Sequence, residues 1–319
     1  MASAAASLPW FDQTLHVGIR LGEVTLWESR TEGWRWHPDI FSTPPLETPR
    51  PLIAELADGK APLALLYSFP VAPTFPSVTF SRGRVAVVDK RFQHYYVDTG
   101  AGFEAYLQPR NKKTVSTLRR KARKVESMSP DGRAFRVHRL PAEMDAFLDI
   151  ALPVSERSYQ YRLLGQGLPM DPGYRAQLRA MAERNEVVAY TLHLGERAIA
   201  YTVCPIYGGN RALYDHTGFD PDFAEYSPGA VLQFRIIEDL CARQGVDFYD
   251  LCTGEGRHKE TFATGAIECA NIFIFPVLSR HSPLFALRWT FDATTALAAR
   301  LLARFGIKGR LKRLIRRSA

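Results

Sequence analysis

Cysteine is scarce in this sequence, and long apolar runs are missing. The four cysteines of the 319 residues are Cys204, Cys241, Cys252 and Cys269. They form no C-x-x-C pair and have no histidine at ligand spacing, which argues against a zinc site or disulfide framework and indicates a reducing cytosol. No stretch approaches the roughly 20 apolar residues that span a bilayer, and the first residues lack the pattern of a signal peptide. We expect a cytoplasmic protein, soluble or peripheral on the inner face of the membrane.

The common phosphate-binding motifs are also missing. There is no G-x-x-x-x-G-K-[ST] segment and no G-x-G-x-x-G after a predicted strand, which argues against a P-loop or a dinucleotide-binding domain. The composition, 46% hydrophobic and 23% charged, is that of a globular protein and excludes disorder and a collagen-like repeat.

The net charge of +8 is concentrated in two acid-free patches. Residues 300–317 contain eight Lys and Arg residues, which equals the net charge of the whole chain. The net charge of residues 1–299 is therefore zero. The second patch consists of Arg110, Lys112, Lys113, Arg119, Arg120, Lys121, Arg123 and Lys124. Function is therefore to be sought near these two patches.

The order of predicted elements indicates a mixed α/β fold. Residues 1–102 read as short strands broken by prolines, and residues 103–125 as a basic helix. From Glu186 onward the pattern is three strands, a loop, a long helix over 228–244, a strand, a short helix and a last strand over 267–276. The third strand, 212–218, is expected to be continuous. One crossover helix in the middle of such a unit is typical of a mixed sheet.

A strand-to-helix junction stands out at Ser227-Pro228-Gly229. Ser227 suits the N-cap, Pro228 suits the first helical position, and Gly229 lets a ligand approach the backbone. Free N–H groups at such a helix start favour an anion. A plain capped helix is the alternative interpretation.

The surrounding segments resemble the acetyltransferase family named for CelD and BcsL, in the GNAT superfamily and related to the FemAB aminoacyl transferases. The segments that carry the resemblance are YDHTG at 214–218, YSPG at 226–229, GVDFYDL at 245–251 and GEGRHK at 254–259. An extra Gly256 departs from the family pattern. The resemblance implies a GNAT N-acyltransferase fold with a mixed central sheet over 103–280. Residues 1–102 then form an N-terminal α/β region, conceivably a degenerate second GNAT half, and 281–319 a basic amphipathic tail.

The resemblance also implies a co-substrate. The pyrophosphate of an acyl thioester would rest on Ser227, Pro228, Gly229 and Ala230, with acyl-CoA or acyl carrier protein as donor and no permanently bound cofactor or metal. The basic helix fits the acidic carrier, through Arg119, Arg120 and Arg123. A solvated helix face is the alternative for these arginines.

Five residues are candidates for proton transfer and charge stabilisation. His216 is the first choice for the base, because a histidine titrates near neutrality; strand alternation would send its neighbour Asp215 to the opposite face. Glu255 and Lys259 either form an ordinary ion pair or serve the reaction. Asp250 either accepts from loop amides or belongs to the site. Tyr226 either donates to the leaving thiolate or packs under the loop.

The C-terminal segment has the pattern of an in-plane membrane helix. Its apolar residues recur at helical spacing among cations: Ile307, Leu311, Leu314 and Ile315. A helix packed on the body of the protein is the alternative, and nucleic acid is the less favoured partner because no recognisable binding module is present.

These features together predict an N-acyltransferase that moves an acyl group from a thioester to a primary amine. A membrane-seeking tail favours a lipidic acceptor, as in the bacterial ceramide-forming type, which acylates a long-chain sphingoid amine. The alternatives are acylation of an exopolysaccharide sugar, FemAB-like aminoacyl transfer, or a non-catalytic membrane or nucleic-acid adaptor.

Overall fold

The structure is a computed structural model. It describes the chain except residues 1–10, 22–23, 58–62, 130–131, 160, 162–166, 254–255, 289, 291–293 and 295–319. The chain divides into two compact units, unit 1 with Met1–Arg91 and Glu268–Ala319 and unit 2 with Phe92–Ile267. The boundaries differ from the sequence-based 102 and 280, because the strands β5 (Arg84–Asp98) and β12 (Gly265–Pro276) each run from one unit into the other.

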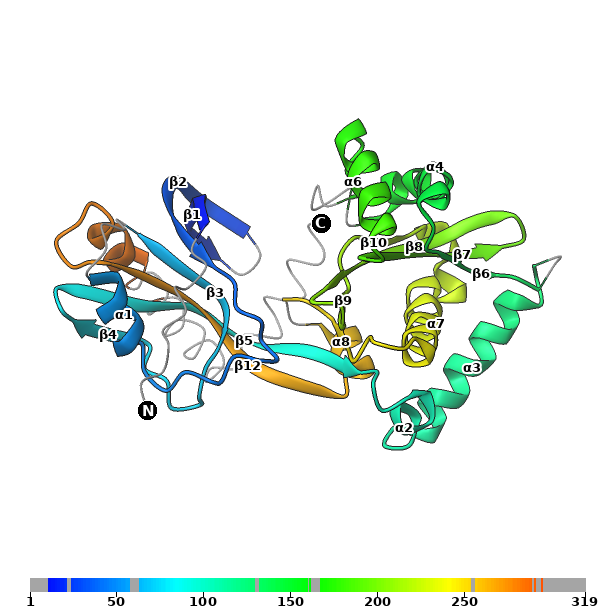
Figure 1. The fold of residues 1–319 in the computed structure, drawn as a ribbon, viewed down its shortest axis with the longest axis horizontal. Helices are drawn as coiled ribbons and strands as arrows, with labels where there is room; N and C mark the ends of the chain where they lie inside the picture. Colours follow the sequence, from blue (N-terminus) through cyan, green and yellow to red (C-terminus); the bar gives the residue numbers. More distant parts are fainter. Residues whose placement is uncertain are drawn as a thin grey trace, which may run out of the picture. The chain divides into compact units, whose positions relative to one another are not determined.

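Unit 1 is a small α/β unit (Figure 1). Besides its parts of β5 and β12 it contains β1 (Phe11–Leu21), β2 (Val24–Trp36), α1 (Arg50–Ala57), β3 (Ala64–Pro70) and β4 (Val78–Ser81). Its strands follow the order β1-β2-β3-β12, and β4 pairs with β5. Residues 16–21 and 24–27 belong to the antiparallel pair of β1 and β2. That residues 1–102 are a second GNAT-like half stays a prediction.

Unit 2 carries a mixed sheet. Its strands, with part of β5, are β6 (Phe135–His138), β7 (Val187–Leu194), β8 (Arg197–Tyr207), β9 (Arg211–Leu213), β10 (Thr217–Phe219) and β11 (Phe248–Asp250). They follow the order β5-β11-β9-β8-β7-β6, with β10 on β8; β11 and β9 are parallel, and the remaining pairs within unit 2 are antiparallel.

Helices cover both faces of this sheet. They are α2 (Phe103–Leu107), α3 (Lys112–Glu126), α4 (Pro141–Arg157), α6 (Pro172–Glu183), the 3₁₀ helix η1 (Pro221–Tyr226), α7 (Pro228–Ala242) and α8 (Arg257–Phe262). One buried core joins α3 and α7 to the sheet, and another joins α4 and α6 to it. The strand β8 contributes side chains to both cores. Ile199 and Cys204 belong to the first core, and Tyr201 and Val203 belong to the second. This is the mixed α/β GNAT-type architecture that the sequence predicts.

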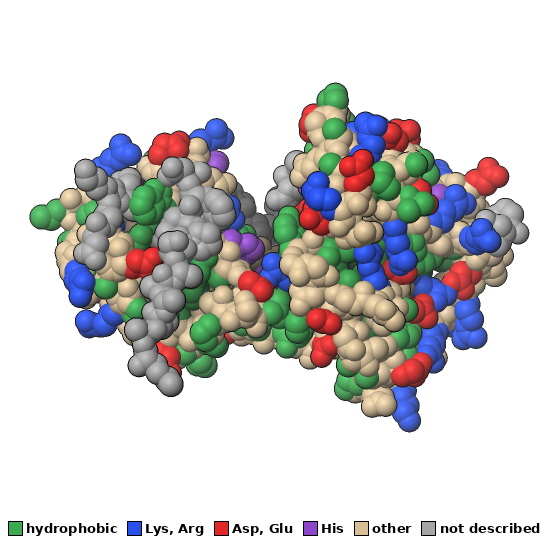
Figure 2. Space-filling view, viewed as in Figure 1, with side chains coloured by type: hydrophobic (Ala, Val, Ile, Leu, Met, Phe, Trp, Pro, Cys, Tyr) green, Lys and Arg blue, Asp and Glu red, His purple; other side chains and the backbone are tan. Residues whose placement is uncertain are grey.

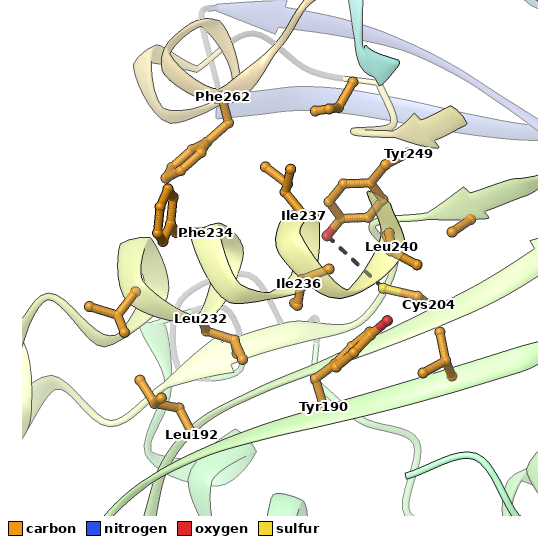
Figure 3. Packing of buried hydrophobic residues seen from close by; sticks show 14 of the residues in the cluster. Tyr190, Leu192, Cys204, Leu232, Phe234, Ile236, Ile237, Leu240, Tyr249 and Phe262 are labelled. Atoms are coloured by element: carbon orange, nitrogen blue, oxygen red, sulfur yellow. Dashed lines mark hydrogen bonds between the residues drawn. The ribbon is translucent and has the colours of Figure 1, made fainter. Parts of the chain in front are cut away.

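The crossover helix α7 is the central element of the first core. Its side chains Leu232, Ile236, Ile237 and Leu240 are almost fully buried, and Figure 3 shows Ile237 and Leu240 beside the ring of Tyr249 and Leu232 on the side of Leu192. Burying one such aliphatic side chain stabilises the fold by about 1.5–3 kcal/mol. The position of the N-terminus of α7 is therefore fixed by the packing of the whole helix.

The strand that leads to α7 is broken, which corrects the predicted continuous strand over 212–218. β9 pairs with β11, and Tyr214 N–H still donates to the Asp250 carbonyl (2.8 Å). On its other side β9 pairs with β8, and from Thr217 onward β10 pairs with β8 as well. Between them Asp215 N–H donates to the Val203 carbonyl and Val203 N–H donates to the His216 carbonyl, so the chain stays on β8 but leaves β11 after Tyr214.

A buried carboxylate fixes the segment between β10 and α7. Asp220 has no exposed surface, and its Oδ2 accepts from Arg157 Nε (2.9 Å) and from an Arg197 guanidinium nitrogen (2.8 Å). A buried charge is tolerated only when it is paired and hydrogen-bonded in this way. These bonds tie the start of η1 to α4 and β8.

The predicted C-terminal membrane helix at 307–315 lies outside the described residues. Residues 282–288 form a helical segment after β12, and Phe285 packs on Phe273 and Phe275. None of the helices in the described part of the chain is long and apolar enough to cross a bilayer.

Candidate active site

A cavity of about 340 Å³ lies where the broken strand and the N-terminus of α7 diverge. Its walls come from the link between β9 and β10, from β10, and from η1, α7 with its N-cap, and α8: Tyr214, Thr217, Gly218, Phe219, Ala224, Ser227, Pro228, Gly229, Ala230, Gln233, His258 and Phe262. All four residues predicted to hold a pyrophosphate are among them. A concave, mainly apolar site with a few polar groups is the usual form of a ligand pocket.

The junction at Ser227 begins the helix as predicted, but it does so without a side-chain cap. Ser227 is the N-cap in a left-handed conformation (φ 53°), Pro228 is the first helical residue, and the Ser227 side chain makes no capping bond. Its Oγ accepts from Lys121 Nζ instead (2.6 Å). Ser227 is thus the N-cap by position only, because its hydroxyl contacts the lysine and not the helix backbone.

The backbone at this helix start leaves one amide open. Pro228 has no N–H, and the N–H groups of Ala230 and Val231 donate to the Ser227 carbonyl (3.0 and 3.1 Å). Within the described part of the chain the Gly229 N–H has no acceptor. A Cβ at Gly229 would meet only Phe219, at an ordinary 3.6 Å, so the space beside this glycine is open. An anion placed there would meet a free amide and the positive end of the helix dipole.

The Lys and Arg side chains of the basic helix α3 lie in two places. Lys121 reaches Ser227, and Lys124 Nζ lies 4.7 Å from the centre of the Tyr226 ring. Arg119 and Arg123 line another cavity of about 530 Å³ with Lys112, and Arg120 is exposed. Figure 2 shows Lys and Arg side chains over the place that α3 has in Figure 1. The cations at the α7 start are thus two lysines, which the sequence reasoning did not single out from the run.

Helix α8 brings a histidine to the cavity. His258 lines it together with Phe262, and its ring lies 6.5 Å from that of Tyr214. Although the residue as a whole is exposed, desolvation of its ring and the charge of Lys259 both lower the pKa of His258 from its ordinary 6.5. A neutral imidazole at pH 7 can accept a proton. His258 belongs to the GEGRHK segment at 254–259, so this segment could have indicated it as a candidate site residue.

The end of α8 is held by an arginine from the loop before α3. The Arg110 guanidinium donates to the carbonyls of Thr261 and Phe262 (both 2.6 Å) and Ala263 (2.9 Å), and it lies over the Tyr106 ring at 3.9 Å. Charge-assisted bonds to the last carbonyls of a helix are favourable. Arg110 thereby keeps Phe262 against the cavity.

The predicted Lys259 is buried and turned toward the backbone. Its Nζ donates to the carbonyls of Cys252 (3.2 Å) and Thr253 (2.7 Å), and burial lowers the pKa of Lys259. It is not among the residues that line the cavity. Glu255 lies outside the described residues, so its role stays a prediction.

Asp250 holds the other side of the same loop. Its Oδ1 accepts from Cys252 N–H (2.7 Å) and lies 2.5 Å from His94 Nε2. Burial raises the pKa of Asp250, but the hydrogen bond and charge of His94 outweigh burial and keep that pKa below its ordinary 3.8. Of the two predicted roles, these contacts favour the acceptor of loop amides. No local sequence pattern indicates His94, because it lies 156 residues from Asp250 along the chain.

Asp250 and Lys259 together fix a strained loop. Cys252 has a positive φ of 59°, which costs energy for a residue with a Cβ. Its N–H is bound by Asp250 and its carbonyl by Lys259, so the conformation is determined from both sides. The loop leads directly into α8 and His258.

His216 and Tyr226 lie beside the cavity rather than on its lining. His216 Nε2 is 3.7 Å from Asp215 Oδ2, and its ring packs edge-on to that of Tyr174 (5.6 Å). The expectation that Asp215 and His216 face opposite ways is wrong, because the strand is broken here and alternation does not apply. Tyr226 ends η1 under Lys124.

Comparison with known proteins places this site in a recognised domain. Residues 112–260 match the acetyltransferase (GNAT) domain family, a segment that runs from α3 into α8 and so includes both ends of the site. No curated protein matches the chain. Among solved structures it is similar to FemX (11% identity, 87% of this chain and 90% of that chain, TM-score 0.48). It is also similar to L-PGS from Bacillus licheniformis (14% identity, 72% of each chain, TM-score 0.45). The chain contains a GNAT-type domain and is a transferase enzyme.

The contact between Asp250 and His94 makes a testable contribution to stability. We expect Asp250→Asn to lower the free energy of unfolding by about 3–5 kcal/mol, because it leaves one partner of a buried pair uncompensated. Since the folded pKa of Asp250 is lowered, its stabilisation is present above the unfolded pKa and is lost as the pH falls through the folded one. Urea unfolding of both proteins at a series of pH values should show the difference shrinking below about pH 4.

The matched control is Asp247→Asn, three residues earlier and exposed, which should change the free energy of unfolding by less than about 0.5 kcal/mol. An Asp250→Asn loss that is the same at every pH would contradict the ion-pair account.

Proposed function

We propose that the protein is an N-acyltransferase that moves an acyl group from an acyl thioester to a primary amine. The single observation that carries this proposal is the cavity at the start of α7, where Gly229 offers an open amide and the neighbouring Ser227 and Tyr226 are contacted by Lys121 and Lys124. This set of donors suits the pyrophosphate of acyl-CoA. The apolar walls from Phe219 and Phe262 suit the arm that carries the thioester.

The reaction needs a proton acceptor for the attacking amine. The amine nitrogen attacks the thioester carbonyl carbon, a C–N bond forms, the C–S bond breaks, and the ammonium proton goes to a base while the thiolate leaves. We assign the base to His258, because it lines the cavity and the pKa of its ring is lowered. His216, outside the lining but close by in sequence to Tyr214, is the alternative base, and Glu255 the second.

The remaining candidates position the site. Asp250 and Lys259 hold the loop before α8 from both sides, so they act on His258 through the backbone. The ring of Tyr226 contacts the ammonium group of Lys124. Arg119 and Arg123 line the neighbouring cavity, where they would meet the acidic surface of an acyl carrier protein if that is the donor.

For the acceptor we propose a long-chain amine of the sphingoid type, taken from a membrane surface. The support is in the sequence: an apolar face and clustered cations at 307–315, as an in-plane helix requires. Aminoacyl transfer and sugar acylation are the competing activities.

The function is tested with the full chain and purified substrates. Release of free thiol from a long-chain acyl-CoA should require a long-chain primary amine, and mass spectrometry should show the amide product. Turnover only of acetyl-CoA with an amino sugar would reject the lipid acceptor while keeping acyl transfer. No turnover with acyl-CoA or acyl carrier protein and any amine would reject the proposal itself.

Lys121 tests the anion site. We expect Lys121→Met to raise KM for the acyl-CoA roughly tenfold, the equivalent of about 1.4 kcal/mol, with little change in kcat, because a phosphate contact binds ground state and transition state alike. Lys113→Met removes the same charge from the exposed first turn of α3 and should leave both constants unchanged. Equal effects of the two substitutions would mean that only the overall charge of α3 matters.

The pH profile tests the base. If neutral His258 accepts the proton, kcat/KM falls as the pH drops through its pKa, and the lowered pKa places this acidic limb below pH 6.5. His258→Gln should reduce kcat by about 10²–10⁴ and abolish the limb. A limb that persists in His258→Gln but disappears in His216→Gln would assign the base to His216.

A further inference from the structure

Unit 1 contains an apolar cavity of about 450 Å³ that acyl transfer does not explain. It lies between the hairpin of β4 and β5, the end of β12 and the helical segment 282–288 (Figure 1). Its walls are Val78, Phe80, Val85, Val87, Phe275, Val277, Ser282, Phe285 and Ala286. Ser282 is the one polar side chain among these described residues, and its Oγ already donates to the Val277 carbonyl (2.5 Å). The cavity therefore offers a ligand almost only hydrocarbon.

The strand register explains why one face of the hairpin is apolar. Val78 pairs with Val87 and Phe80 with Val85, so alternation places these four side chains on the same face. Ala86, on the other face, belongs to a separate buried core. The cavity face is incompletely covered, because Phe80 remains 64% exposed.

Two further exposed apolar residues are sequence neighbours of residues that line the cavity. Leu278, next to the lining Val277, is 97% exposed, and Leu287, next to the lining Ala286, is 59% exposed. The Val277 N–H donates to the Gly83 carbonyl at the hairpin turn (2.9 Å), so Leu278 lies near that turn. Water-exposed apolar groups gathered around an apolar cavity mark an interaction surface.

The charges of the same segments have one sign. Residues 78–87 and 275–288 contain no acidic residue and four arginines: Arg82, Arg84, Arg280 and Arg288. Arg288 is paired with Asp89, and Arg82 is exposed at the turn of the hairpin. In the sequence, the acid-free patch of residues 300–317 follows the same helical segment. Exposed apolar groups flanked by cations are what binding to an anionic bilayer requires.

We propose that this cavity binds one hydrocarbon chain of an anionic membrane phospholipid. The chain enters between the β4–β5 hairpin and the segment 282–288, Phe80 and Leu278 contact the bilayer, and Arg82 pairs with the phosphate of the headgroup. The volume lies within the range of ligand pockets. This site goes beyond the proposed function and does not depend on it, since it concerns lipid binding and not turnover.

The test uses the full chain and vesicles of phosphatidylcholine with phosphatidylglycerol that carries a photoreactive group on one acyl chain. Irradiation should link the lipid to segments 78–87 and 275–288, as peptide mass spectrometry would show. Ala286→Trp fills the cavity without removing apolar surface or charge, so the cross-link yield should fall at least about tenfold. Leu287→Trp, in the same helical segment but outside the lining, is the matched control and should retain the yield.

The headgroup contact has its own pair of variants. Arg82→Gln should weaken partition onto the same vesicles by about fivefold, the equivalent of about 1 kcal/mol. Lys90→Gln removes an exposed charge further along β5 and should have less effect. Vesicles of phosphatidylcholine alone should bind all variants weakly.

Three results would overturn the proposal. Cross-links outside these segments, or an undiminished yield in Ala286→Trp, would show that the cavity holds no lipid chain. A yield that appears only after residues 299–319 are deleted would show that the chain's own C-terminal segment fills the cavity. Cross-links between two copies, with a dimer in sedimentation velocity, would show that a second copy covers it. If Ala286→Trp unfolds, Val78→Lys at the partly exposed wall replaces it.

Discussion

The separation of the chain from β11 after Tyr214 is the constraint on which the site depends. A strand that stayed paired with β11 would leave no space beside the start of α7. Because β9 and β10 both pair with β8 while only β9 pairs with β11, a wedge opens between β10 and β11, and the N-terminus of α7 is directed into it. The cavity, the open amide of Gly229 and the approach of α8 all follow from that separation.

Buried charged groups hold the segments around the wedge. Asp220 fixes the chain before α7 through two arginines, and the contact of His94 with Asp250 fixes the chain after β11. Lys259 binds backbone carbonyls of the loop before α8, and Arg110 binds those at the C-terminal end of α8. In a low-dielectric interior such contacts are favourable only when every group is satisfied, so they specify loop positions as well as contributing stability. Two residues that look catalytic in the sequence, Asp250 and Lys259, thus contact the backbone of the loop before α8.

The two units contain cavities of different chemical character. In unit 2 one cavity is lined by Gly229, at the start of α7, and by His258, whose pKa is lowered by desolvation and the charge of Lys259. Unit 1 presents an apolar cavity with exposed aliphatic and aromatic side chains and arginines. A transferase with a lipidic acceptor would use both surfaces, one for the reaction and one for the membrane.

Local patterns determined much of this protein. The sequence alone predicted the mixed α/β class and the start of α7 at Pro228, and it singled out residues 227–230, which line the cavity, because caps, prolines and periodicity act within a few residues. Only the tertiary structure decided which lysines of α3 reach Ser227, that Lys259 turns to the backbone, and that His94 joins Asp250. It also broke the strand at 214–216. These outcomes depend on packing between segments up to 156 residues apart, which no local pattern encodes.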